Sequence, residues 1–355
     1  MSFKEGLLFQ YVIVVKEKEY MNKFILFLIT MLSLIRLYAQ DPQYSQFYAN
    51  ALYLSPAFAG AEQNTRAIVA SRYQWPGLDA AFLSHTVSVD HYFTNHKSGI
   101  GIIATSDLST ASKLKSTEAG IIYSYQADLS KKIVFRPALQ LSYVTRSINF
   151  SRLSFASQFD DNGFKGGNTN ENSNFNSISY ADISTGGLLY SEKYWIGFSA
   201  HHLNRPDQSF MKGESRLPVK AALFGGYKFS FTPEWRKRHV NPDEEKSISP
   251  TFLYKMQGKS DQLDLGLYGR YNKLVLGIWY RGIPVKLYKS EKANNDAIIL
   301  LFGVIHNGFQ IGYSFDYTIS KLTIMSGGSH ELTLSYGFKT RTKKKIQKRP
   351  ACPKF

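Results

Sequence analysis

The sequence predicts an all-β fold, a transmembrane antiparallel β-barrel of outer-membrane type with about fourteen strands. Three observations support this prediction. Apolar and polar residues alternate with a period of two over segments of about ten to thirteen residues, longer than the roughly five or six usual in soluble sheets. The connections between these segments are short and long in turn. Aromatic residues make up 15% of the chain, and they cluster near segment ends, as the interfacial girdles of a membrane barrel require.

The segment 309–317 shows the alternation clearly. Phe, Ile, Tyr, Phe and Tyr occupy its odd positions, and Gln, Gly, Ser and Asp occupy its even positions. A soluble sandwich would turn the apolar face inward, whereas a membrane barrel turns it toward lipid and keeps a polar lumen. The segment lengths, the aromatic clusters and the terminal aromatic Phe338 of the last segment favour the barrel.

The spacing of the connections supports the same fold. If both ends of the barrel chain are periplasmic, links after even-numbered strands should be short, and most others, such as 147–177 and 283–294, should be long and polar. The short link at Lys259 and the charged segment 231–247 are exceptions. Pro137 forfeits a ladder hydrogen bond unless a bulge absorbs it. The expected strands are 64–73, 82–93, 98–107, 115–127, 131–146, 178–191, 193–203, 216–230, 248–258, 260–271, 273–282, 295–306, 308–319 and 328–339.

The ends of the chain differ from its body. Residues 21–40 have a short cationic start, an apolar run and a small residue near their end, which together predict a signal peptide. Residues 1–20 are interpreted as an upstream extension. Much of the formal charge of +16 lies in the basic tail 340–355, so we expect no nucleic-acid surface. This leaves the segment 41–63 and the barrel, 64–339, as the body of the exported protein.

The sequence contains no recognisable catalytic set, and we expect no enzyme activity, cofactor or metal site. His201 and His202 are adjacent on one strand, so they point to opposite faces and cannot share a metal. The charged residues on the expected lumen face most plausibly pair with one another, because polar barrel interiors need such pairing. A transport pathway through them remains open. These residues are Glu118, Arg136, Asp264, Arg270, Asp316 and Glu331.

The segment Asp41–Gly60, DPQYSQFYANALYLSPAFAG, combines aromatic residues with Gln, Asn and Ser at close spacing and turns at its end. It resembles the opening motif of the PorP/SprF family, outer-membrane components of the type IX secretion system of Bacteroidetes. The chain departs from that motif at Ala51 and Ser55, where Pro and Asn are expected. The closing Cys352-Pro353-Lys354-Phe355 also resembles the ending of some members. The motif residues are Asp41, Pro42, Gln43, Ser45, Gln46, Asn50, Leu54, Pro56 and Gly60.

The resemblance implies a location in the outer membrane, in contact with its lipid, and a non-enzymatic role. Family members support export or surface attachment of large adhesins, including gliding adhesins, so the implied partners are the secretion machinery and a secreted adhesin. We expect the N-terminal segment to pack in or under the lumen. The alternative function is a transport channel for small or hydrophobic solutes, which the same barrel could support.

The segment Asp41–Gly60 and the periplasmic segment 231–247 are predicted to form the side of the barrel that meets the secretion machinery. Trp235 lies there among Arg236 and Arg238, with acidic residues shortly after. An aromatic anchor flanked by charges of both signs is typical of specific contact surfaces. The alternative is a solvated loop whose tryptophan rests at the membrane interface.

Overall fold

A computed structural model describes most of the predicted barrel. Residues 1–40 and 340–355 lie outside the described residues, as do Trp235, Arg236 and Arg238, so the expectations about them stay predictions. The described ranges are 41–149, 153–161, 163–166, 177–210, 213–231, 245–288, 292–320 and 324–338.

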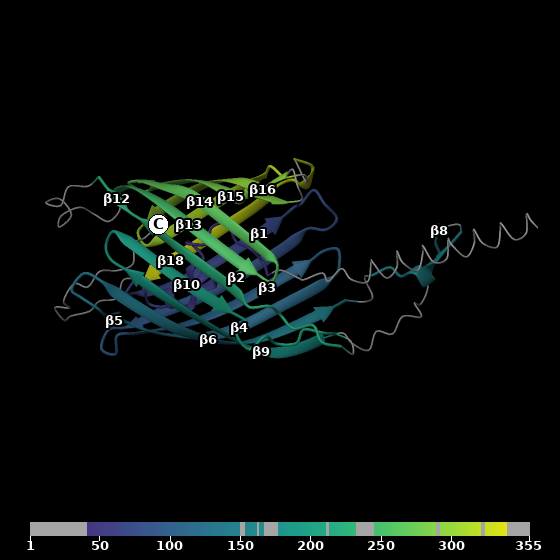
Figure 1. The fold of residues 1–355 in the computed structure, drawn as a ribbon, viewed down its shortest axis with the longest axis horizontal. Helices are drawn as coiled ribbons and strands as arrows, with labels where there is room; N and C mark the ends of the chain where they lie inside the picture. Colours follow the sequence, from purple (N-terminus) through teal and green to yellow (C-terminus); the bar gives the residue numbers. More distant parts are fainter. Residues whose placement is uncertain are drawn as a thin grey trace, which may run out of the picture. The chain divides into compact units, whose positions relative to one another are not determined.

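Fourteen long antiparallel strands form the wall of the barrel (Figure 1). The short strands β5 (Ala127–Asp128) and β12 (Phe229–Ser230) extend the same sheet, while β7 (Phe159–Asp160) and β8 (Gly163–Phe164) pair only with each other. The long strands are β1 (Thr65–Gln74), β2 (Phe82–Phe93), β3 (Ser98–Ser109), β4 (Leu114–Tyr125), β6 (Val134–Ile148), β9 (Ser177–Tyr190), β10 (Tyr194–His201), β11 (Lys220–Tyr227), β13 (Lys246–Gln257), β14 (Ser260–Tyr271), β15 (Leu274–Tyr288), β16 (Lys292–His306), β17 (Phe309–Thr318) and β18 (Ser329–Phe338).

The first and last strands close the barrel. β1 pairs with β18 from Thr65–Phe338 to Gln74–Ser329, and every other long strand pairs with its neighbours in chain order. Closure satisfies the backbone N–H and C=O groups that a free sheet edge would expose to lipid. The prediction of a closed barrel with about fourteen strands is confirmed.

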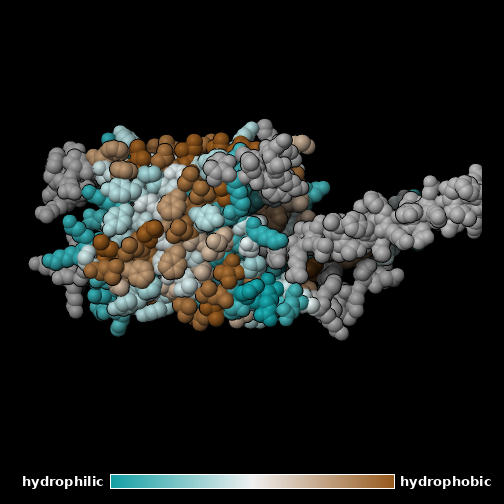
Figure 2. Space-filling model, viewed as in Figure 1, coloured by the Kyte–Doolittle hydropathy of each residue, from teal (hydrophilic) through white to brown (hydrophobic). Residues whose placement is uncertain are grey.

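The alternation of side chains gives the barrel an apolar outer face. On β6, Leu139, Leu141 and Tyr143 are exposed, whereas Gln140 and Ser142 between them are buried on the inner face. The other strands repeat this pattern, and Figure 2 shows apolar residues along the side of the barrel with hydrophilic residues toward its ends. Outward apolar and inward polar side chains are the arrangement expected of a membrane barrel.

One predicted long connection is wrong. Residues 283–294 were expected to form a polar loop, but β15 continues to Tyr288 and β16 starts at Lys292. The pairing of the two strands shifts register beside Gly282, which has a φ of 150°. A β-bulge of this kind bends and twists a strand but does not end it. β15 and β16 therefore continue as a paired hairpin where a loop was expected.

Pro137 interrupts a ladder without a bulge. β4 pairs with β6 up to Ser124–Ala138, and the pairing resumes in the same register at Ala127–Phe135. The interruption lies beside Pro137, because proline has no N–H to donate to the neighbouring strand. Pro137 thus forfeits ladder pairing to β4, which is the outcome expected where no bulge absorbs it.

Within the described ranges, helical structure is confined to single turns. Two of them, α2 (Ala51–Leu54) and η1 (Pro56–Phe58), precede β1, and two others, η3 (Ala156–Gln158) and η5 (Ile324–Ser326), lie in connections. Among the described residues, no helix is both long and apolar enough to cross a membrane.

Candidate functional site

The candidate site is the interior of the barrel, which is filled by residues 42–60, here called the plug. Most plug side chains are buried, and several of them, including Ser45, Gln46 and Leu52, have no exposed surface. Ser45 contacts Arg72 near the end of β1, while Gly60 contacts Asp90 near the end of β2. β1 and β2 are antiparallel neighbours, so these contacts lie toward opposite ends of the barrel. The plug therefore runs along the lumen.

The plug has a defined local structure. The N–H of Asn50 donates to the C=O of Gln46 at 3.0 Å, and this turn leads into α2. The Ser55 hydroxyl accepts from the N–H of Ala57 at 3.3 Å and caps η1, which Pro56 opens. Gly60 has a φ of 68°, a conformation that favours glycine, and turns the chain toward β1.

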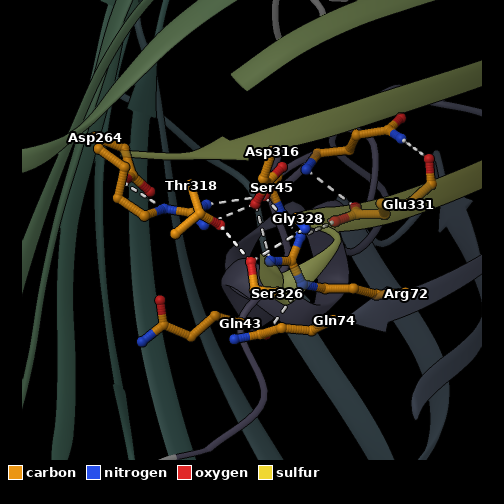
Figure 3. A network of polar contacts seen from close by, with 12 residues as sticks. Gln43, Ser45, Arg72, Gln74, Asp264, Asp316, Thr318, Ser326, Gly328 and Glu331 are labelled. Atoms are coloured by element: carbon orange, nitrogen blue, oxygen red, sulfur yellow. Dashed lines mark hydrogen bonds and ion pairs between the residues drawn. The ribbon is translucent and has the colours of Figure 1, made fainter. Parts of the chain in front are cut away.

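The hydroxyl of Ser45 is the centre of a buried polar network (Figure 3). It donates to the Asp316 carboxylate at 2.6 Å and accepts from the guanidinium groups of Arg72 at 2.8 Å and Arg281 at 2.9 Å. A serine hydroxyl can donate one hydrogen bond and accept two, so its hydrogen-bonding capacity is fully used.

Glu331 binds the backbone of the same part of the plug. Its carboxylate accepts from the N–H of Ser45 at 2.7 Å and from the N–H of Gln46 at 3.0 Å. The Gln46 amide donates to the backbone C=O of Glu331 at 2.9 Å. At the head of the plug, the Gln43 side chain accepts from Lys255 at 3.3 Å. Three motif residues are thus fixed by the polar wall.

The charged wall residues also pair among themselves. Arg72 contacts Asp316 at 2.9 Å and Glu331 at 3.3 Å, and Arg281 contacts Asp264 at 3.1 Å and Asp316 at 2.9 Å. The three carboxylates are among the six lumen charges that were predicted to pair with one another. Their main cationic partners are instead Arg72 and Arg281, which are not among those six.

The other three named charges have local partners. Gln140 donates to Glu118 at 3.1 Å, and Arg270 contacts Glu245 at 3.0 Å. Arg136 donates to the C=O of Ala59 at 2.6 Å and to the hydroxyl of Ser124. Arg136 therefore anchors the end of the plug.

Another part of the lumen wall is aromatic. Phe47 packs edge-on against Trp279 with ring centroids 4.7 Å apart, and Phe58 stacks on Phe224 at 5.5 Å. Tyr48 packs against Trp195, and its hydroxyl donates to the backbone C=O of Gly225 at 3.1 Å. Aromatic packing of this kind buries a large apolar area. The plug thus has one polar and one aromatic contact surface.

The close approach of the plug to the wall requires glycine at position 99. A Cβ atom built there would overlap the carbonyl group of Ala59, whereas a Cβ atom at Gly101 would lie 3.5 Å from the Ala59 Cβ, an ordinary contact. We expect Gly99→Ala to lower the free energy of unfolding by about 1–3 kcal/mol, because overpacking forces backbone shifts. Gly101→Ala is the matched control. Urea unfolding of both variants should show the larger loss for Gly99→Ala, and similar losses would contradict the close packing of the plug.

The described residues offer little for chemistry at this site. They contain no group of three or more His, Cys, Asp or Glu side chains placed to bind a metal. His202 contacts Asp182 at 3.1 Å, and His201 lies beside Ser184 at 3.1 Å. Asp182 and Ser184 are both buried on the inner face of β9, so the expectation that the two histidines point to opposite faces is wrong. The alternation ends there because β10 stops at His201 and His202 has a φ of 61°. What the arrangement does provide is a binding surface that encloses a polypeptide segment.

These features define an outer-membrane β-barrel whose lumen is plugged by its own N-terminal segment. The chain belongs to the family described as type IX secretion system membrane protein PorP/SprF, which matches residues 37–336. The resemblance found in the motif is thereby confirmed. No curated protein matches the chain.

Solved structures of other barrels are distantly similar. A Pseudomonas aeruginosa FadL homologue is 11% identical, with 82% of this chain and 94% of that chain covered and a TM-score of 0.40. The P. putida toluene transporter TodX is 10% identical, with 82% and 95% covered and a TM-score of 0.44. CdiB from Acinetobacter baumannii is 8% identical, with 78% and 60% covered and a TM-score of 0.38. These similarities are too distant to indicate what this chain binds.

Proposed function

We propose that the protein is a non-enzymatic component of the type IX secretion system that supports export or surface attachment of a large adhesin. Membership of the PorP/SprF family supports the link to this secretion system. The finer role, including the adhesin and the contact with periplasmic parts of the machinery, is our inference.

The observation that carries the proposal is the plug. The motif residues that carry the family resemblance fill the lumen, and they are fixed by hydrogen bonds at Ser45, Gln46 and Gly60. A lumen filled in this way favours a scaffold or docking partner over an open channel for solutes.

Purification of the tagged protein from outer membranes tests the proposal. We expect a secreted adhesin to copurify, and a strain lacking the protein to lose display of that adhesin while other outer-membrane proteins stay at normal levels. Conductance of the purified protein in planar bilayers separates the two functions. A large steady conductance, with normal adhesin display in the deletion strain, would support the solute channel instead.

A further inference from the structure

The plug has no charged side chains, whereas the wall that it contacts has several. No residue from Pro42 to Gly60 carries a charged side chain. The wall residues Arg72 and Arg281 contact the carboxylates of Asp316 and Asp264 directly. Departure of the head of the plug would remove a hydroxyl and backbone N–H groups from this network, but each charged residue of the network would keep an oppositely charged wall partner. The polar wall is therefore compatible with a change of occupant.

The aromatic wall sets the condition for such a change. Trp195, Trp279 and Phe224 are almost completely buried, and the plug residues Phe47 and Phe58 contribute to that burial. An empty, hydrated lumen would expose these large apolar side chains to water, which is unfavourable. An occupant with large apolar side chains, such as the phenylalanines of the plug, can replace the plug without that loss. The aromatic wall thus favours replacement of the plug by another segment over an empty, hydrated lumen.

The fit of the plug is incomplete. Both polar atoms of the Asn50 side chain and the Oε1 atom of Gln46 are buried without a hydrogen-bond partner among the described residues. On the facing wall, the hydroxyls of Ser314 and Thr333 are in the same condition. Buried polar groups without partners lower stability. Another segment with similar chemistry could therefore compete with the plug.

The direction of the plug indicates where a competitor would enter. Ser45 contacts Arg72, close to the end of β1 from which the connection 75–81 leaves the barrel. The other end, Gly60, is held by Asp90 and is followed directly by β1. The head of the plug thus lies toward the mouth that carries this connection, while its tail is covalently tied to the wall. A competing segment would displace the head first.

We propose that the lumen is a binding site for a polypeptide segment, and that the plug is its intramolecular occupant. The external ligand is an uncharged stretch of a partner protein, with Ser and Gln near its head and Tyr and Phe at spacings like those of the plug. It enters at the mouth beside the head of the plug and takes the place of residues 42–58. This binding site goes beyond the proposed function, since it does not depend on the identity of the secreted partner.

A fluorescent synthetic peptide with the sequence of residues 42–60 tests the proposal on the full chain in detergent micelles. Its binding is followed by fluorescence anisotropy in a Cys352→Ser background. We expect saturable binding, with a scrambled peptide of the same composition binding about tenfold more weakly or worse. Absence of saturable binding, or equal binding of the scrambled peptide, would overturn the proposal.

A lock on the plug provides the second arm of the test. The Ser55 hydroxyl lies against the position that a Cβ atom at Gly186 would occupy, so cysteines at both positions can form a disulfide. In Ser55→Cys/Gly186→Cys, oxidation should reduce peptide binding about tenfold or more, and reduction should restore it. Heat-modifiable migration on a gel shows that the oxidised barrel is folded. Unchanged peptide binding to that folded barrel would show that the peptide binds outside the lumen. If this variant does not fold, the comparison of native and scrambled peptides still tests whether the lumen binds the segment.

Discussion

Replacing Leu265 with arginine should lower the stability of the membrane-inserted barrel by about 2–4 kcal/mol. Leu265 lies in the middle of β14, and 45% of its surface is exposed on the outer face. Its neighbours across the ladder, Phe252 and Tyr280, share this face. A charge at this depth must either stay in hydrocarbon or deform the bilayer, and both are unfavourable.

Gln262→Arg is the matched control, because it adds the same charge to the inner face of the same strand. The Gln262 amide donates to the Asp264 carboxylate at 2.8 Å, so an arginine there has an anionic partner. Urea titrations of folding into lipid vesicles, followed by tryptophan fluorescence, measure both changes. We expect a clearly smaller loss for Gln262→Arg. Equal losses would mean that the exposed face of β14 does not meet lipid.

The barrel could be predicted because its physical requirements repeat along the chain. Each spanning strand needs apolar side chains on one face, and this period of two is visible without knowledge of any contact. The even number of long segments then favours a closed barrel, because single-chain bacterial barrels have even strand numbers. Tight turns also have local signals, such as Asn307-Gly308, where both residues have positive φ.

Features that depend on pairing geometry could not be predicted. The extension of β15 and β16 relies on a register shift beside Gly282, and the polar residues there resemble a loop in the sequence. The loss of ladder pairing at Pro137 was expected because proline lacks an N–H, but whether a bulge accompanies it depends on how β4 pairs with β6. In both cases the outcome depends on a partner strand that is not visible from the segment itself.

The candidate site was only half visible in the sequence. The motif Asp41–Gly60 identified the plug, since its aromatic residues and amides stand out from the alternating strands. Its partners did not stand out, because Ser45 and Asp316 are 271 residues apart. Arg72 and Arg281 each lie at an inward position of a strand, so listing every inward-facing charge would have found them.

Arg281→Met should have the largest effect of these substitutions, a loss of about 3–5 kcal/mol in the free energy of unfolding. Arg281 is 3% exposed and contacts Asp264, Asp316 and the hydroxyl of Ser45. Methionine fills a similar space but leaves the two carboxylates with fewer cationic partners in a buried setting. The cost of an inadequately paired buried charge exceeds that of the lost contacts themselves.

Lys286→Met on the same strand is the control for this prediction. Lys286 pairs with Asp261, but its side chain is 51% exposed, so the loss should be about 0–1 kcal/mol. Urea unfolding in the same lipid compares the two variants. If both lose little, the buried network does not stabilise the barrel, and aromatic packing alone keeps the plug in place. A large loss for Arg281→Met alone would show that the wall charges contribute to the stability of the plugged barrel, because the two variants remove the same charge from one strand and differ in burial.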